Sequence, residues 1–146
     1  MYFVEKLYRP VSLSEALDIL AEHPQAWPLA GGTDVLVKMR HQRLRGVELL
    51  SLLKIAELRG IEKLDNGDIA IGAMSTFTKI AESALIGAEV PMLKTAALSM
   101  GGPQIQNVAT IGGNICNGAT SADSAPSLFA LDALLELHSP GGVRLV

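Results

Sequence analysis

The sequence predicts a mixed α+β fold made of two subdomains, and three observations support this prediction. Apolar runs with helix and strand periods alternate over residues 1–59, which is typical of a small sheet with crossover helices. Asn66-Gly67 lies between two alternating runs and predicts a β-hairpin. The composition, 49% hydrophobic and 18% charged, is that of a folded domain rather than a disordered tail. We therefore place a boundary near Gly60, between residues 1–59 and 60–146.

The first subdomain is expected to contain a helix, a strand, a helix and a second strand. Their cores lie at residues 16–21, 26–30, 35–40 and 47–52. Ser12 and Glu15 form a capping box that begins the first helix, and His23-Pro24 ends it. Trp27, in the short strand that follows, is expected in the core.

The second subdomain is expected to begin with the hairpin and to continue with helices. The expected segments are strands at 61–64 and 69–72, helices from Ser75 and over 91–98 and 124–131, and a final hairpin at 134–138 and 143–146. Within the glycine-rich stretch from Gly101 to Gly118, the part from Thr110 to Gly118 is expected to be a loop. Because a chain rarely ends directly after a hairpin, the sequence is expected to be a fragment.

Composition and charge exclude several function classes. A net charge of -3 without a basic cluster argues against nucleic-acid binding. Mean hydropathy is +0.32, yet no apolar run is long enough to span a membrane, and the first six residues do not resemble a secretory signal, so a cytoplasmic location is expected. The lone Cys116 excludes an internal disulfide or an iron–sulfur cluster held by this chain alone, and we expect no metal site and no catalytic side-chain constellation.

The first candidate binding segment runs from Leu29 to Asp34. An expected strand delivers Gly31-Gly32 into the start of an expected helix, a pattern that points several backbone amides at one place and suits an anion. Thr33 offers a hydroxyl, and Asp34 is suited to cap the helix or to accept from a ribityl or ribose hydroxyl. The same residues also fit an ordinary capped turn without a ligand.

The second candidate segment runs from Thr110 to Gly118. Its glycines, hydroxyls and amides lie in an apolar context and carry no charge, and Asp123 beyond it is suited to accept from a sugar hydroxyl. An asparagine-rich loop satisfied by its own backbone is the alternative. Since both segments lack Lys and Arg, we expect them to converge and to share one diphosphate through bare amides. The Rossmann fingerprint and the P-loop motif are both absent from the sequence.

Four segments resemble the FAD-binding subunits of the molybdenum hydroxylases, the family that includes the xanthine dehydrogenase and carbon monoxide dehydrogenase medium subunits. They are Ala30-Gly31-Gly32-Thr33-Asp34, the run from Gly101 to Ala109, Thr110-Ile111-Gly112-Gly113-Asn114, and Ala122-Asp123-Ser124-Ala125-Pro126. The match runs in order over essentially the whole chain. It implies a two-subdomain FAD-binding fold of the vanillyl-alcohol oxidase type, with the second subdomain truncated, because the family's subunits are longer than this chain.

The resemblance also implies which residues contact the cofactor. FAD would lie between the subdomains against Leu29, Ala30, Gly31, Gly32, Thr33, Asp34, Val35, Gly101, Thr110, Ile111, Gly112, Gly113, Asn114, Cys116 and Asp123. By the same resemblance, electrons would reach FAD from molybdopterin on a large subunit through 2Fe-2S clusters on a small subunit, with NAD among the onward acceptors. Two alternatives are a docking piece that contacts partner subunits without binding FAD, and another reductase of the same fold.

Overall fold

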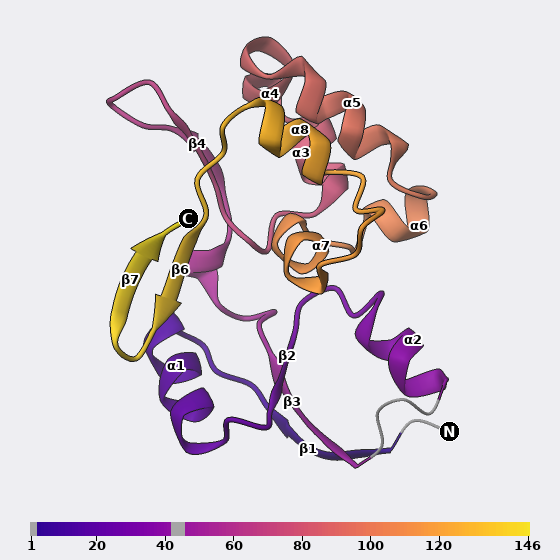
Figure 1. Ribbon diagram of the computed structural model, residues 1–146, viewed down its shortest axis with the longest axis vertical. Helices are drawn as coiled ribbons and strands as arrows, with labels where there is room; N and C mark the ends of the chain where they lie inside the picture. The colour runs from indigo at the N-terminus through magenta and orange to yellow at the C-terminus, as the bar shows by residue number, and fades with distance from the viewer. Residues whose placement is uncertain (1–2, 42–45) are drawn as a thin grey trace.

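The computed structural model of this chain describes residues 3–41 and 46–146. Its first half contains a three-stranded parallel sheet with helices between the strands (Figure 1). The elements are β1 (Val4–Tyr8), α1 (Leu13–Glu22), β2 (Trp27–Leu29), α2 (Val35–Arg40) and β3 (Val47–Ser51), and the strand order is β1-β3-β2. The expected helix-strand-helix-strand order is confirmed. The strand β1 is an addition to it.

The start of α1 is stabilised by side chains, as the capping box predicts. Ser12 Oγ accepts from the Glu15 N–H at 3.2 Å, whereas Glu15 Oε2 accepts from the N–H of Val11, one residue before the cap. Glu57, from the short 3-10 helix η1 (Ala56–Leu58), also accepts from the Leu13 N–H at 3.1 Å. A small core forms where Ala16 of α1 packs with Leu50 and Ile55.

Both outer strands of the sheet differ from the sequence expectations. β1 is largely exposed and carries Glu5 and Lys6, so its apolar alternation is weak, as is common in edge strands. The expected burial of Trp27 is wrong, since its side chain is 38% exposed. The reason is its position on β2, the other edge of the sheet, where the strand leaves one side open.

The second half is mainly helical, with a hairpin at each end. Its elements are β4 (Ile61–Lys63), β5 (Ile69–Ile71), α3 (Phe77–Glu82), α4 (Ala84–Glu89), α5 (Pro91–Ser99), α6 (Pro103–Gln106), α7 (Ile111–Asn117), α8 (Ala125–Ala130), β6 (Glu136–Ser139) and β7 (Gly142–Leu145). The core contains Phe77, Ile80, Ile86 and Leu93, all with nearly complete burial. Both expected hairpins and the helices that correspond to α3, α5 and α8 are confirmed; α4 is an addition. In the described ranges, no helix is long and apolar enough to cross a membrane.

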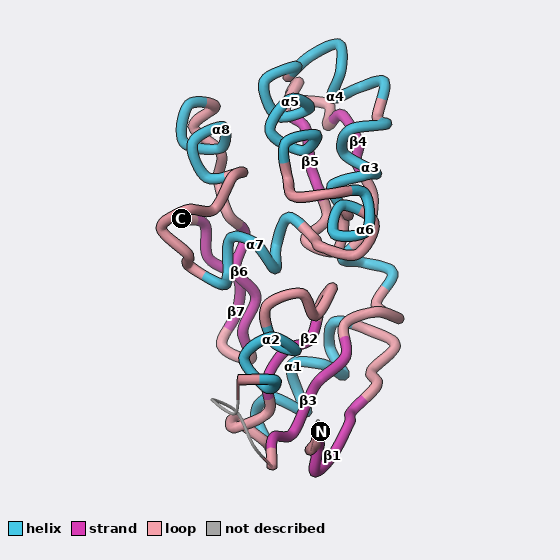
Figure 2. Tube along the Cα trace, turned by 90° about the vertical axis from the view of Figure 1, so that its right-hand side faces the viewer, coloured by secondary structure: helices cyan, strands magenta, loops and turns pink. Residues whose placement is uncertain are grey.

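The expected loop from Thr110 to Gly118 is wrong, because this segment contains α7; the short helix α6 before it is an addition. Helix α7 includes both Gly112 and Gly113 and ends at Gly118, which adopts the left-handed conformation with φ of 62°. Tertiary packing explains this helix: a Cβ on Gly112 would lie 2.7 Å from the Cβ of Ala73. In two perpendicular views α7 lies between the three-stranded sheet with α1 and α2 below and the helices α3, α4, α5 and α8 above (Figures 1 and 2).

Candidate functional site

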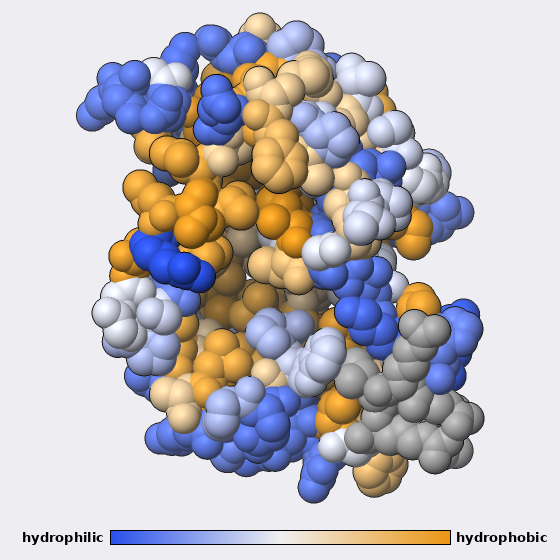
Figure 3. Space-filling model, in the orientation of Figure 1, coloured by the Kyte–Doolittle hydropathy of each residue, from blue (hydrophilic) through white to orange (hydrophobic). Residues whose placement is uncertain are grey.

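The two glycine segments line one cavity of about 630 Å³. The space-filling view shows the molecule hollowed between its lower and upper halves, with hydrophobic residues inside the hollow (Figure 3). The cavity wall is formed by Trp27, Pro28, Ala30, Gly31, Gly32, Thr33, Asp34, Val35, Lys38, Leu52, Ala73, Met74, Met100, Ile105, Ala109, Thr110, Gly112, Gly113, Asn114, Cys116, Asn117, Ala119, Ser121 and Ala122. The predicted convergence of the two segments is therefore confirmed. A cavity of this size is in the range of small-molecule sites.

The first segment fits between the sheet and the second half because Gly31 has no side chain. A Cβ at this position would lie 1.9 Å from the Val108 carbonyl oxygen, so only glycine permits this approach. Gly32 has φ of 79°, a conformation that also favours glycine. These two residues turn the chain from the end of β2 into α2 along the cavity wall.

The backbone of this first segment leaves hydrogen-bond donors unused. Within the described ranges, the N–H groups of Gly31, Gly32 and Thr33 donate no hydrogen bond. Asp34 precedes α2, but its side chain makes no capping hydrogen bond, so that expected role is wrong. A row of unpaired amides on a cavity wall is suited to bind an anion, because each one needs an acceptor.

The second segment uses its amides internally. The Gly112 N–H donates to the Ala73 carbonyl at 2.9 Å, and the Gly113 N–H donates to Thr110 Oγ1 at 3.2 Å. Ile111 and Asn114 also donate to carbonyl oxygens. The expectation that both glycine pairs present bare amides is therefore wrong for the second pair. Its glycines allow close packing instead: a Cβ on Gly113 would lie 3.6 Å from the Cβ of Ala30.

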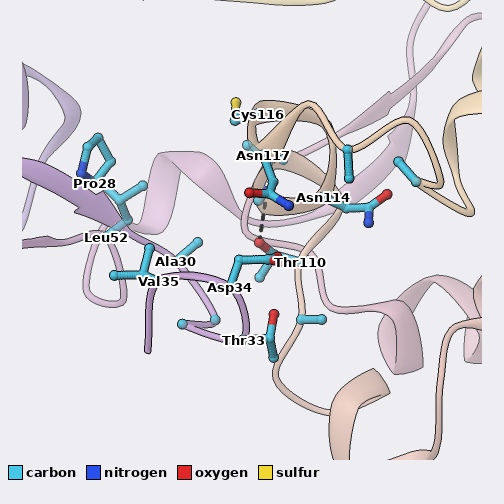
Figure 4. A pocket seen from close by; sticks show the side chains of 18 of the residues that line it. Pro28, Ala30, Thr33, Asp34, Val35, Leu52, Thr110, Asn114, Cys116 and Asn117 are labelled. Atoms are coloured by element: carbon cyan, nitrogen blue, oxygen red, sulfur yellow. Dashed lines mark hydrogen bonds between the residues drawn. The ribbon is translucent and has the colours of Figure 1, made fainter. Parts of the chain in front are cut away.

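Polar side chains of both segments line the cavity (Figure 4). Thr33 and Asp34 come from the loop after β2, and Asn114 and Asn117 come from α7 on the other side. Ser124 Oγ donates to Asn114 Oδ1 at 2.6 Å, which fixes that amide and directs its N–H groups away from this bond. The cavity thus combines unpaired backbone donors with hydroxyl and amide side chains.

Four predicted site residues lie outside the cavity wall. Leu29 packs behind Gly32, Ile111 belongs to the helical core, Gly101 precedes α6, and Asp123 is exposed beside the buried Ser124. The remaining predicted residues, Cys116 among them, line the cavity.

Sequence reasoning missed Lys38, the cation on the wall. Its Nζ donates to Asn117 Oδ1 at 2.8 Å and lies 5.7 Å from the centre of the Trp27 ring. Lys38 follows Asp34 by four residues, and this spacing on a helix puts both side chains on one face. This four-residue spacing is the sequence signal from which Lys38 could have been identified as a site residue. Asp34 and Lys38 are the charged residues of the wall among those the structure describes.

Three groups away from the cavity, Tyr8, Glu48 and Glu57, have shifted pKa values. Burial, then the hydrogen bond to Glu48, raises the pKa of Tyr8, and the same bond lowers the pKa of Glu48. Hydrogen bonds from backbone N–H groups, its own and that of Leu13, lower the pKa of Glu57. In the part of the chain that the structure describes, no group of three His, Cys, Asp or Glu side chains is arranged to hold a metal ion.

Comparison with known proteins gives consistent results in sequence and structure. Residues 3–146 match the family described as FAD binding domain in molybdopterin dehydrogenase. The chain is 48% identical over its full length to the xanthine dehydrogenase FAD-binding subunit of Escherichia coli O157:H7, and covers 50% of that protein. It is 34% identical over 95% of its length to the carbon monoxide dehydrogenase medium chain of Afipia carboxidovorans, and covers 48% of it.

Solved structures show the same relationship. The fold is similar to a chain of the Cu,Mo-CO dehydrogenase in its cyanide-inactivated form, with a TM-score of 0.95 at 32% identity; the match covers 100% of this chain and 51% of the other. Quinoline 2-oxidoreductase from Pseudomonas putida 86 also gives a TM-score of 0.95, at 25% identity, over 100% of this chain and 51% of the other. The chain thus spans about half the length of the relatives that it matches.

Proposed function

The chain belongs to the family of FAD-binding domains in molybdopterin dehydrogenases, and from this premise we propose that the cavity between the glycine segments holds FAD. The row of unpaired N–H groups at Gly31, Gly32 and Thr33 carries the proposal. These donors are suited to the oxygens of a diphosphate, and glycine at two of the three positions lets a ligand approach the main chain.

The two halves of the chain would contribute different groups to FAD binding. The first segment supplies backbone donors and the Thr33 hydroxyl, while α7 supplies a rigid wall that its capped and packed N-terminus holds in place. Asp34 carries a carboxylate on the same wall, which is suited to accept from a sugar or ribityl hydroxyl. Bound FAD would supply the redox chemistry, and the protein would supply position and electrostatics.

We further propose a place for the chain in a larger enzyme. It would act in the FAD-binding medium subunit of a molybdenum hydroxylase similar to xanthine dehydrogenase, with a molybdopterin-binding large subunit and a 2Fe-2S small subunit as partners. Electrons would pass from the iron–sulfur clusters to FAD and onward, with NAD as an acceptor. The two separate hydrophobic clusters favour a division into residues 1–59 and 60–146, with FAD between them.

FAD titration of the purified chain tests this proposal, with flavin fluorescence as the readout. Gly32→Val places a branched side chain on the cavity wall at φ of 79° and is expected to abolish measurable FAD binding. Gly67→Val is the matched control, because φ is 92° there and the residue lies in the hairpin turn away from the cavity. The proposal is overturned if the unmodified chain does not bind FAD, or if Gly32→Val binds it as well as Gly67→Val does.

A further inference from the structure

Lys38 occupies a position in the cavity that the two glycine segments do not explain. It belongs to α2, reaches across to α7 through its hydrogen bond to Asn117, and is half-buried. Its other close partner is the face of the Trp27 ring, at a distance typical of a cation–π contact. The side chain is thus held on the wall instead of extending into solvent.

Both of these partners are neutral. Among the described residues, no carboxylate forms an ion pair with the Lys38 ammonium group. Asp34, one helical turn earlier, is the acidic residue of the wall, and it makes no such pair with Lys38. A half-buried ammonium without a counterion attracts an anion more strongly than an exposed one, because solvent screens it less.

The unpaired amides near Gly32 lack the full positive charge that Lys38 carries. They offer directed hydrogen bonds to an anion but contribute only partial charges, whereas a diphosphate carries two negative charges at neutral pH. Burying those charges without a cation is costly. The wall that presents the amides also presents Lys38, so one anionic ligand in the cavity can use both.

Resting on the proposed function, we infer that Lys38 is the positioning residue that neutralises the phosphate part of the dinucleotide. The ammonium exchanges its bond with Asn117 Oδ1, or shares it, when the phosphate group is present. Asn117 and Trp27 then serve to hold the lysine over the cavity before the ligand arrives. This residue sets a preference for phosphorylated flavins over neutral ones.

The test measures FAD and riboflavin binding at low and high salt for the unmodified chain and three variants. Lys38→Met removes the charge but keeps the length of the side chain, and is expected to weaken FAD binding about tenfold at low salt, the effect of losing one charge-assisted hydrogen bond. It should also remove most of the salt dependence of FAD binding. Riboflavin, which has no phosphate, should bind Lys38→Met and the unmodified chain equally.

Two further variants separate a charge effect from a structural one. Asn117→Ala removes the partner that holds the ammonium group over the cavity but keeps the charge, so it is expected to weaken FAD binding less than Lys38→Met does and to leave its salt dependence in place. Lys94→Met, on α5 and outside the cavity wall, is the matched control for a lost lysine and should behave like the unmodified chain. Circular dichroism of each variant checks that it is folded.

Three outcomes overturn the inference. If Asn117→Ala weakens FAD binding as much as Lys38→Met does, the hydrogen bond between Lys38 and Asn117 only holds α2 and α7 together, and the lysine charge does not act on the phosphate. If Lys38→Met keeps both the affinity for FAD and its salt dependence, the lysine does not face the phosphates. If the unmodified chain binds no FAD, the proposed function itself is wrong, and the inference is lost with it.

Discussion

The two glycine pairs on the cavity wall have similar sequences and different structures. Ala30-Gly31-Gly32-Thr33 is an irregular turn whose N–H groups are unpaired within the described ranges, whereas Ile111-Gly112-Gly113-Asn114 is the first turn of a helix whose N–H groups are all bonded. In both pairs, a glycine allows the chain to approach another backbone segment closely, Val108 in one case and Ala73 in the other. A glycine pair in a sequence therefore indicates close backbone approach, and only the hydrogen bonds distinguish a binding loop from a packing contact.

The largest expected effect is on the close approach of the first pair. Gly31→Ala puts a methyl group 1.9 Å from the Val108 carbonyl oxygen, and backbone on both sides must move. We expect a loss of stability of about 3 kcal/mol, at the upper end of overpacking penalties, measured by urea unfolding.

Gly113→Ala is the counterpart in the second pair. Its Cβ would meet the Thr110 hydroxyl at 2.9 Å, so the hydroxyl must shift and the helix cap that it forms with the Gly113 N–H is weakened, at a cost of about 1 kcal/mol. Alanine favours the helix over glycine by about 1 kcal/mol, so the net change should be small. Equal unfolding midpoints for the two variants would show that Gly31 does not lie against the Val108 carbonyl group.

A pair of threonine variants sharpens the comparison. Thr110 is buried and accepts from the Gly113 N–H, so Thr110→Val removes a helix cap and should cost about 1 kcal/mol of stability. Thr33 lines the cavity and makes no hydrogen bond among the described residues, so Thr33→Val should change stability by less than about 0.5 kcal/mol while weakening FAD binding. Chemical unfolding and FAD titration of both variants measure the two effects. The comparison fails if Thr33→Val destabilises the fold as much as Thr110→Val does.

The features predicted from the sequence are those set by local chemistry. Asn66-Gly67 fixes a hairpin within a few residues, and Ser12 caps a helix that begins at the next residue. In contrast, α7 contains two glycines, which cost a helix about 1 kcal/mol each, and it packs against Ala73, which is distant in the sequence and accepts from the Gly112 N–H. Sequence periodicity does not contain such a contact, so the stretch resembles a loop.

The candidate site, like the fold, could be predicted in part from the sequence. The resemblance places both glycine segments on one ligand, and the structure brings them to one cavity. Lys38 was missed because its role depends on the packing of α2 beside α7, which joins it to Asn117. The burial of Trp27 was mispredicted because a large aromatic residue near a strand is usually in the core, whereas β2 is an edge strand beside the cavity.

The smallest expected effect concerns the start of α1, a third segment where backbone N–H groups lack a backbone acceptor. There a carboxylate from another part of the chain fills the role of an anion: Glu57 accepts from the Leu13 N–H, and backbone hydrogen bonds lower the pKa of Glu57 below its ordinary value of 4.5. A carboxyl group with a lowered pKa stabilises the fold above its ordinary pKa, and this stabilisation is lost as the pH falls through the lowered value. Glu57→Gln should therefore flatten the decrease in melting temperature below about pH 4.5.

The control for this small effect is Glu62→Gln, an exposed residue of β4. It should leave the pH dependence of the melting temperature as it is in the unmodified chain. If the melting temperature of Glu57→Gln falls with pH in the same way as that of the unmodified chain, down to about pH 3, the Glu57 carboxylate does not act at the start of α1. If the profile flattens as expected, an anion stabilises free backbone amides in this protein even at an exposed site, which is the interaction that we propose for the loop at Gly32 with a phosphate as the acceptor.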